Sequence, residues 1–575
     1  MRRHCVSWLV AMFAFLALAG TSPMLPLVWD EGELIGRASL VKRWGGQVIG
    51  YLSGHNAEQS PFSQEAIATS WRSTTVIEGH PGGYLAIIAI GRTLADVVPQ
   101  LPQKTAWRLG PILLMSLALG VTFSTIRQHF DTTAALFAVT AVLLVPRVFA
   151  HAHFATCDGV LMAAWLLAVA TFPLPQHTAQ RKGRIIVSGL VWGVCFGLTL
   201  SAKFTGWAIC VPFAIMFVVS LGFRLQPSGF RQNKAASFSP EVRSPKSEAC
   251  LPYLVGICTA LLVFFLLNPP LWHRPCAGIA EFFHLNTHRG QFNVSILFWG
   301  RMYDLNHPLP WYNTLVWVAI TFPTLLLAML PLGVYRMFPR GNQRDDEQSK
   351  RTHFSWLIVL NAVVLLIVRA FPGTPPHDGI RLIVAAFPFL AIIAGIGMSQ
   401  LWQQTEKRLI GRMTVVLVLV VSTGNLVFYA PQWLSFYNAV IGGVNGASRK
   451  GFEPTYYWDA LDAEVIAAIN ANTKDNEKIC FTPAKKSMTL DLVRVWDGLQ
   501  PAFRPDAPGE YRWYVFQCRP SGLTPVDRIL LRDFEPAYIK YVTQPSLFSF
   551  KPKQTPVLYV FTYEDYLTVQ KDDHR

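Results

Sequence analysis

Acidic, basic and imidazole side chains recur in this sequence directly beside long apolar runs, where they could act on a substrate at a membrane surface. Asp30 and Glu31 follow the first apolar run, and Asp158 precedes a later one. Ionisable groups at a membrane face are costly to desolvate and so are usually functional. A carboxylate can take a proton from an acceptor hydroxyl or amine, while a cation neutralises a phosphate leaving group. The other candidates are His80, Lys203, His377 and Arg381 for the phosphate, and Glu78, Asp378 and Tyr84 as further cavity residues.

Each candidate taken alone also has a structural interpretation. The Asp30-Glu31 pair could simply end a helix in water. Asp158 could face the positive end of a helix dipole, and Lys203 could extend from a hairpin turn to the interface. His80 and His377 neighbour prolines and could be exposed loop residues. The functional interpretation therefore depends on whether the fold brings these residues to one place.

The composition is that of a membrane protein. Of the 575 residues, 51% are hydrophobic and only 15% are charged, and the mean hydropathy is +0.31, which is too apolar for an ordinary soluble enzyme. The net charge is +15, but the Lys and Arg residues form short clusters between apolar runs, as the positive-inside rule describes. The basicity therefore indicates topology and contact with anionic membrane lipids, and it argues against nucleic acid as a partner.

Hydropathy predicts an all-α polytopic membrane protein with about eleven transmembrane helices. One apolar stretch, residues 84–98, is interrupted by Arg92 after about eight residues, or ~12 Å of helix, against ~30 Å of hydrocarbon, so we expect it to lie in the interface or to re-enter. With that choice the N-terminus and every basic loop face the cytoplasm, and all the candidate residues face outward. The expected spans are 7–28, 109–126, 133–150, 159–173, 185–201, 204–222, 251–268, 311–333, 354–370, 382–400 and 413–430.

The domain organisation follows from the same pattern. Residues 1–430 form the predicted membrane domain, with a first periplasmic loop at 29–108 that holds interfacial helices and a cytoplasmic loop at 223–250. Residues 431–575 are water-soluble in character, and we expect a small extracytoplasmic α/β domain there, with the C-terminus outside. Its predicted elements are a helix at 459–470 and strands at 479–481, 511–517, 538–542 and 557–563. Cys480 and Cys518 share this region and would allow one disulfide in an oxidising compartment.

Six short motifs carry a resemblance to a known family. They begin with Asp30-Glu31 and end with a Gly-Phe-Glu-Pro-Thr-Tyr-Tyr motif at the head of the soluble region. In this order and sidedness the chain resembles the integral membrane glycosyltransferases of C-type fold, specifically the bacterial relatives of protein O-mannosyltransferases and of aminoarabinose transferases. The motifs are Asp30-Glu31, Glu78-Gly-His-Pro-Gly-Gly-Tyr84, Ala155-Thr-Cys-Asp158, Leu200-Ser-Ala-Lys203, Pro376-His-Asp-Gly-Ile-Arg381 and Gly451-Phe-Glu-Pro-Thr-Tyr-Tyr457.

The resemblance implies an inverting transfer of one sugar from a polyprenyl-phosphate donor to a protein, lipid or glycan acceptor, at the periplasmic face of a bacterial cytoplasmic membrane. It implies that Asp30 is the base, that Glu31 shapes the same site and that Asp158 is a second catalytic acid. His80, Lys203, Arg381 and His377 would lie on the phosphate side. The aminoarabinose transferases carry an Arg shortly after the acidic pair and Lys-Pro-Pro in the first loop, where this chain has Glu33 and His80-Pro81-Gly82. These departures argue against lipid A and aminoarabinose as substrates.

Two other function classes remain to be weighed. A transporter or flippase for lipid-linked glycans predicts ionisable groups deep within spans and broken helices in matching halves, whereas these charges lie at helix ends. A non-enzymatic membrane scaffold would leave the acidic pair without a role. The sequence identifies no cofactor. It leaves a divalent cation open, because His151 and His153 with Asp158 form only a weak candidate metal set.

Overall fold

The computed structural model describes residues 2–55, 60–72, 79–174, 182–225, 246–288, 294–338, 346–376, 379–404, 408–474, 476–482, 487–505, 507–544 and 552–573 of the chain. Up to residue 430 these residues are almost entirely helical, with one short hairpin of β1 (Ile296–Phe298) and β2 (Arg301–Tyr303). The helices are α1 (Arg2–Thr21), α2 (Glu31–Leu52), α3 (Gln64–Ser70), α4 (Gly83–Ala95), α5 (Gln103–His129), α6 (Thr132–Leu143), α7 (Pro146–His151), α8 (Cys157–Ala170), α9 (Lys182–Ala202), α10 (Cys210–Leu225), α11 (Lys246–Leu266), α12 (Pro275–Thr287), α13 (Asn313–Thr321), α14 (Thr324–Met337), α15 (Asp346–Ala370), α16 (Phe387–Gln403) and α17 (Arg408–Tyr429).

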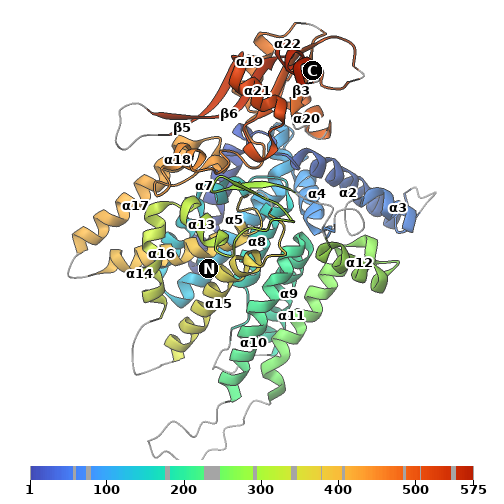
Figure 1. The fold of residues 1–575 in the computed structure, drawn as a ribbon. Coiled ribbons are helices and arrows are strands. Elements are labelled where there is room, and N and C mark those ends of the chain that lie inside the picture. The colour runs from blue at the N-terminus through green and yellow to red at the C-terminus, as the bar shows by residue number, and fades with distance from the viewer. Residues whose placement is uncertain are drawn as a thin grey trace, which may run out of the picture.

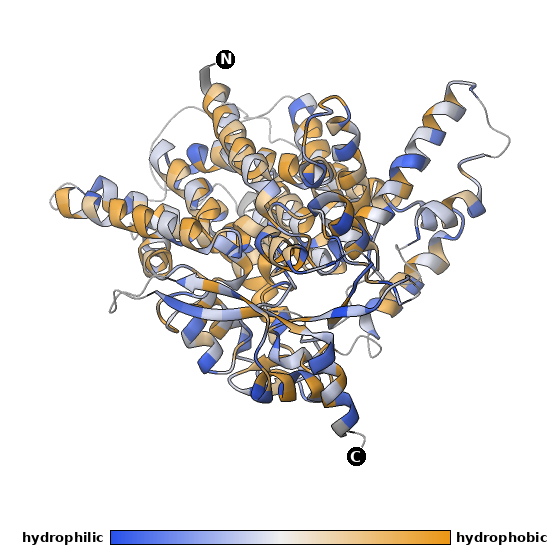
Figure 2. Cartoon of the chain, turned by 90° about the horizontal axis from the view of Figure 1, so that it is seen from above, coloured by the Kyte–Doolittle hydropathy of each residue, from blue (hydrophilic) through white to orange (hydrophobic). Residues whose placement is uncertain are grey.

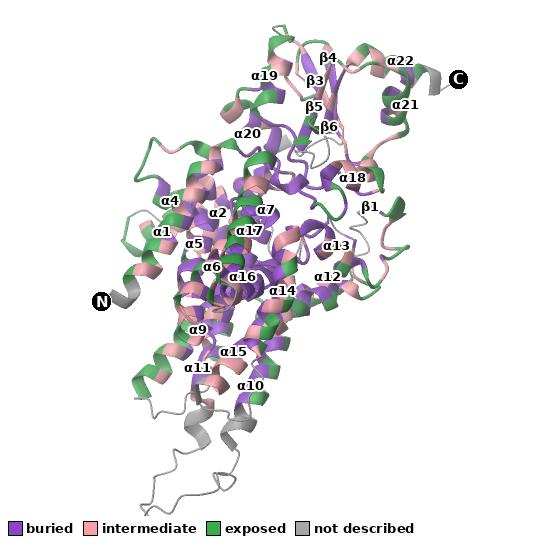
Figure 3. Cartoon of the chain, turned by 90° about the vertical axis from the view of Figure 1, so that its left-hand side faces the viewer, coloured by how far each residue is buried: buried purple, intermediate pink, exposed green. Residues whose placement is uncertain are grey.

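The helical part is a bundle with a β-sheet over one end. Figure 1 shows the C-terminal sheet above the bundle and α9, α10 and α11 extending from the opposite end. Hydrophobic residues dominate the helices of the bundle (Figure 2). Buried residues gather in its middle, while exposed residues lie along its outer helices (Figure 3). This distribution is expected when the outer helices face lipid and the central ones face protein.

The helix lengths make the chain a multi-span membrane protein. Six described helices are long and apolar enough to cross a bilayer, and each coincides with a predicted span: Cys5–Met24, Gln103–His129, Lys182–Ala202, Gln348–Ala370, Val384–Gln403 and Arg408–Tyr429. Four shorter apolar helices lie at four other predicted spans: Thr132–Leu143, Cys157–Ala170, Phe204–Ser220 and Cys250–Leu266. The total of eleven crossings stays a prediction.

Two predicted helices are broken at proline. We expect one helix over 311–333, but the structure has α13 and α14, which meet at 114°. The residue before a proline is driven out of the helical region, and Phe322, before Pro323, is extended at φ −89° and ψ 138°. The expected helix over 133–150 likewise ends as α6, and α7 starts afresh at Pro146 after an extended Val145.

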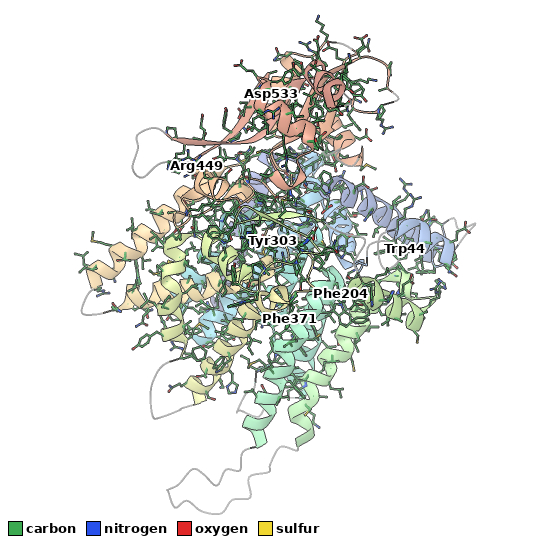
Figure 4. The ribbon with its side chains drawn as sticks, viewed as in Figure 1. Trp44, Phe204, Tyr303, Phe371, Arg449 and Asp533 are labelled. Carbon is green, nitrogen blue, oxygen red and sulfur yellow. The ribbon has the colours of Figure 1, made fainter. Side chains whose placement is uncertain are left out.

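The predicted first loop, residues 29–108, contains the helices α2, α3 and α4, and their interfacial location stays a prediction. α4 has 13 residues, fewer than the ~20 that a span needs, and it packs on α5 so closely that a Cβ on Gly91 would lie 2.3 Å from the Cα of Gly110. The second half of α2 carries Trp44, which lies at one side of the molecule (Figure 4) and contacts Trp71 at 5.4 Å and Trp272 at 6.1 Å between ring centroids.

A glycine seam joins α9 to α11. A Cβ on Gly189, Gly193 or Gly197 would lie 2.7, 2.5 and 2.7 Å from carbonyl oxygens of α11, so only glycine permits this approach. Small residues at four-residue spacing let helices in a membrane approach this closely. Because Lys203 follows the last residue of α9, the seam fixes the backbone that carries it.

Residues beyond 430 form a mixed four-stranded sheet. Its order is β3-β4-β6-β5, with β3 parallel to β4 and the other two pairs antiparallel. All four strands overlap the predicted ones, and the helix predicted at 459–470 starts later, at Ala463, because the Asp462 side chain accepts a capping hydrogen bond from the backbone N–H of Val465. Cys480 and Cys518 are free thiols. The elements are β3 (Lys478–Thr482), β4 (Tyr511–Gln517), β5 (Tyr538–Gln544), β6 (Lys553–Thr562), α18 (Gly443–Arg449), α19 (Ala463–Ala471), α20 (Ser487–Asp497), α21 (Pro525–Asp533) and α22 (Tyr563–Asp573).

The C-terminal segment is docked on the start of α2. A Cβ on Gly32 would lie 2.4 Å from the Cα of Thr489 in α20, and one on Gly36 would lie 3.2 Å from the Met488 side chain. The absence of a side chain at Gly32 therefore lets α20 rest directly on the first turn of α2, next to Asp30.

Candidate active site

Four charged side chains predicted from separate motifs meet in one ion-pair network. Arg381 donates from Nη2 to Asp30 Oδ2 at 2.9 Å and from Nε to Asp158 Oδ2 at 2.9 Å. Lys203 Nζ donates to Asp158 Oδ1 at 2.5 Å. Asp158 is fully buried, whereas 24% of the Asp30 side chain and 13% of the Arg381 side chain are exposed. The network therefore has a buried end at Asp158 and an accessible end at Asp30.

The backbone explains how four distant residues meet. Asp30 immediately precedes α2, and Asp158 lies in the first turn of α8, where a carboxylate faces the positive end of the helix dipole. Lys203 occupies the break between α9 and the 3-10 helix η2 (Phe204–Ile209), and its extended backbone (φ −161°, ψ 151°) turns the chain there. Arg381 lies between α15 and α16. Asp30, Asp158 and Lys203 therefore project from the ends of helices and Arg381 from the turn before α16, where side chains can converge without breaking helical hydrogen bonds.

Glu31 lies next to Asp30 but has a different environment. Both its oxygens accept hydrogen bonds from Arg108, from Nε at 2.7 Å and from Nη2 at 2.7 Å, and both side chains are fully buried. Glu31 Oε1 also accepts from the backbone N–H of Ala155 at 2.9 Å. Arg108 uses its remaining donors on the carbonyls of Ser22, Leu25 and Pro26. The Glu31–Arg108 ion pair connects the segment after α1, the start of α2, α5 and the segment before α8. Its geometry is therefore that of a structural ion pair that holds these helices together.

Tyr457 completes the accessible end of the network. Its hydroxyl donates to Asp30 Oδ2 at 3.1 Å and accepts from Arg381 Nη2 at 3.0 Å. The Arg381 guanidinium carbon lies 3.9 Å from the centroid of the Tyr457 ring, in a cation–π contact. Burial raises the pKa of Tyr457 well above its ordinary value of 10, so the phenol stays protonated. In this form its hydroxyl donates the hydrogen bond to Asp30.

The neighbouring tyrosine has a separate set of partners. Tyr456 shares a hydrogen bond of 2.9 Å with His151 Nε2, and its ring faces the Arg147 guanidinium at 4.9 Å. His153 instead contacts the hydroxyl of Thr21 at 2.8 Å. His151 and His153 thus face different neighbours. No three His, Cys, Asp or Glu side chains within the described ranges are arranged to hold a metal ion.

One further predicted residue, His80, lies on a loop that packs against the end of α9. His80 stands between Gly79, whose carbonyl accepts from Asn286 at 2.6 Å, and Gly82, whose N–H donates to Asn268 at 2.6 Å. A Cβ on Gly83 would lie 2.5 Å from the Cβ of Ser201, so this loop rests on the end of α9 that leads to Lys203.

The remaining candidates divide into one described residue and three that lie outside the described ranges. Tyr84 is fully buried in α4. Glu78, His377 and Asp378 lie outside the described residues, and their roles stay predictions.

Sequence reasoning missed Arg108 and Tyr457. Arg108 stands at the start of a predicted span, where a cation is usually a topology signal. Tyr457 belongs to the aromatic-rich stretch Tyr456-Tyr457-Trp458, and such stretches beside a membrane domain usually indicate an interfacial belt. The signal that could have found Arg108 is the excess carboxylate at Glu31, because a buried charge needs an opposite charge.

Comparison with known families supports the resemblance found in the motifs. Residues 80–228 match the family model described as dolichyl-phosphate-mannose-protein mannosyltransferase. This segment contains His80, Tyr84, Asp158 and Lys203. The match confirms the resemblance to protein O-mannosyltransferases. No curated protein matches the sequence.

Several solved structures are similar to this chain at low identity. ArnT from Cupriavidus metallidurans bound to undecaprenyl phosphate is 14% identical over 96% of this chain and 97% of that one, with a TM-score of 0.46. An oligosaccharyltransferase from Archaeoglobus fulgidus is 11% identical over 98% and 77%, with a TM-score of 0.43. The S. cerevisiae Pmt1-Pmt2 complex bound to the sugar donor is 16% identical over 50% and 34%, with a TM-score of 0.33. These values are too low to bear on donor or acceptor.

Proposed function

We propose that the protein is an inverting glycosyltransferase that moves one sugar from a polyprenyl-phosphate donor to a protein, lipid or glycan acceptor at the periplasmic face of a bacterial cytoplasmic membrane. The observation that carries the proposal is the accessible Asp30 carboxylate held beside Arg381, which is tied through Asp158 to Lys203. The Asp30 carboxylate, which is accessible to an acceptor, thus lies in one network with Arg381 and Lys203, two cations that can bind a phosphate.

The proposed reaction is a single displacement. The acceptor hydroxyl or amine attacks the anomeric carbon of the sugar, and its proton passes to Asp30, which acts as general base. The bond between the anomeric carbon and the phosphate oxygen breaks, and the polyprenyl phosphate leaves with the electron pair. Because the new bond forms on the face opposite the leaving group, the anomeric configuration inverts.

Lys203 and Arg381 are proposed to stabilise the charge that develops on the leaving phosphate, with His80 and His377 on the same side. Asp158 is fully buried and accepts from both cations, so its proposed role is to fix their positions within the catalytic centre. Glu31 is proposed to hold the helix ends through Arg108 and to have no direct contact with substrate.

The periplasmic location is supported by the charge at the two ends of the bundle. Arg108 and Arg127 lie near opposite ends of α5 and are 19 positions apart, which is about 28 Å along the helix at 1.5 Å per residue. At the end away from Asp30, Arg336 pairs with Asp131 and Arg351 donates to the Arg336 carbonyl. The positive-inside rule assigns such a basic end to the cytoplasm, which leaves the catalytic network outside.

The test is Asp30→Asn in a strain from which the gene has been deleted. Mass spectrometry of periplasmic proteins and envelope glycolipids first identifies the hexose-like or pentose-like mass that the deletion removes. Wild-type protein should restore this mass, whereas Asp30→Asn should lower transfer by ~10²-fold or more, since a positioned base contributes about that much. Glu33→Gln, which changes the same charge three residues later, is the matched control and should restore transfer.

Restoration of the missing mass by Asp30→Asn, at wild-type expression, would contradict Asp30 as the base. A deletion strain that loses no glycan at all would contradict the transferase proposal itself.

A further inference from the structure

One side chain of the catalytic network comes from the C-terminal segment. Tyr457 lies 427 positions after Asp30 in the sequence, yet its hydroxyl is 3.1 Å from Asp30 Oδ2. The same hydroxyl is 3.0 Å from Arg381 Nη2. Tyr457 therefore contacts both the proposed base and one of the proposed phosphate-stabilising cations.

The backbone around Tyr457 is fastened directly to the residue before Asp30. The carbonyl of Tyr457 accepts from the backbone N–H of Trp29 at 3.1 Å, and the rings of Trp29 and Trp458 lie 5.3 Å apart between centroids. The Trp29 carbonyl in turn accepts from the Thr489 hydroxyl at 3.5 Å. The loop that carries Tyr457 and the turn that carries Asp30 are thus joined by backbone and ring contacts in addition to the hydrogen bond of the Tyr457 hydroxyl.

This loop is held in an uncommon backbone conformation. Trp458 has a φ of +60°, a left-handed conformation that is strained for a bulky residue. Such strain persists only where the surroundings fix it. Two neighbours hold the Trp458 indole in place. The Trp29 ring packs against it, and the Arg519 guanidinium carbon lies 5.4 Å from its ring centroid. The strained residue sits immediately after Tyr457 and sets the direction of the chain there.

The position of the hydroxyl gives it a specific effect on Asp30. Tyr457 and Arg381 both donate to the same carboxylate oxygen, Oδ2, and Arg381 donates to Tyr457 as well. Three groups in a closed ring of hydrogen bonds fix one another's orientation more firmly than any two would. Rotation of the Asp30 carboxylate would break two charge-assisted hydrogen bonds at once.

We infer that Tyr457 is a positioning residue of the catalytic centre, and that it acts on the reaction through Asp30 and Arg381. This inference rests on the proposed transferase function and deepens it, because it makes the C-terminal segment a part of the active site. A water-soluble module that only covers or presents the membrane part would not need this contact.

The experiment compares Tyr457→Phe with Tyr456→Phe in purified enzyme supplied with the donor and acceptor identified from the deletion strain. Tyr457→Phe keeps the ring under Arg381 and removes only the hydroxyl. Loss of a hydrogen bond to a charged group should lower kcat about 10- to 100-fold, with KM for the donor unchanged. Tyr456→Phe makes the same chemical change one residue earlier, where the hydroxyl contacts His151, and should leave kcat at the wild-type value.

A purely structural role for the Tyr457 hydroxyl would lower thermal stability and leave the kcat of the folded fraction unchanged, and this result would overturn the inference. If Tyr457→Phe does not fold, fluorotyrosine at position 457 keeps shape and hydroxyl but strengthens the donor. An unchanged kcat in that protein would overturn the inference equally. The proposed function fails separately, if the deletion strain loses no glycan or if the wild-type enzyme itself transfers no sugar.

Discussion

The buried pair of Arg108 and Glu31 yields the sharpest stability prediction. Arg108→Met keeps the approximate length of the side chain but removes its charge and its donors. In the wild type Arg108 reaches both oxygens of Glu31 at 2.7 Å, and both side chains are 0% exposed. After the substitution the Glu31 carboxylate keeps only the backbone N–H groups of Ala155, at 2.9 Å, and Val28, at 3.4 Å.

The expected loss follows from leaving a charge buried without its partner. Breaking a buried ion pair by removing one member typically destabilises a protein by ~3–5 kcal/mol, and three carbonyls also lose their donor here. Arg108→Met should therefore lower the free energy of unfolding by about that amount. Replacing both members with Arg108→Met and Glu31→Leu should recover a large part of the loss, because no unpaired charge then remains.

The assay is reversible unfolding in mixed micelles, with a partly exposed ion pair as the matched control. Arg92 pairs with Asp96 one helical turn away, with 19% and 44% of the two side chains exposed. Arg92→Met should cost less than ~1 kcal/mol, as is typical of exposed pairs. The reasoning is refuted if Arg108→Met unfolds within ~1 kcal/mol of the wild type, or if the double variant is less stable than the single one.

Two further predictions concern the C-terminal segment. Gly32→Ala should lower the melting temperature and loosen α20 from α2, because its Cβ would lie 2.4 Å from the Thr489 backbone. Gly45→Ala on the same helix is the control, since its Cβ would meet nothing within 4 Å. Equal melting temperatures for the two variants would show that the contact at Gly32 does not hold the segment. Hydrogen bonds from Lys540 and then Tyr538 hold the pKa of Glu464 below its ordinary 4.5, so this contribution to stability is present above pH 4.5 and is lost as pH falls through the lower folded-state pKa. The melting temperature of Lys540→Met should therefore fall less steeply in this acid range than that of the wild type, and parallel acid profiles would contradict the assignment.

The convergence of the charged residues could be predicted because each lies at the end of an apolar run. Asp30, Asp158, Lys203 and Arg381 all stand where a predicted span begins or ends, and the alternation of basic loops puts those ends on one side of the membrane. The strands of the C-terminal sheet could be predicted as well, because short β-branched and aromatic runs bounded by turn residues mark them.

The ion-pair partner of each acidic residue could not be predicted from its position in the sequence alone. Asp30 and Glu31 are adjacent and chemically similar, yet one faces the accessible network and the other is enclosed by Arg108. The difference arises because α2 begins at this point and turns consecutive side chains in different directions. The helix breaks before Pro146 and Pro323, in contrast, could have been predicted from the sequence, because proline disfavours the helical conformation in the residue before it.

The contact between Tyr457 and Asp30 also has a consequence for biosynthesis. Asp30 follows the first predicted span, Asp158 and Lys203 come later in the chain, and Tyr457 is synthesised only after the last predicted span. A nascent or prematurely terminated chain therefore contains the charged residues without the tyrosine that orients the base. Under the proposed function, such a chain lacks the contact that orients the base, and we expect it to transfer sugar more slowly than a chain that includes Tyr457.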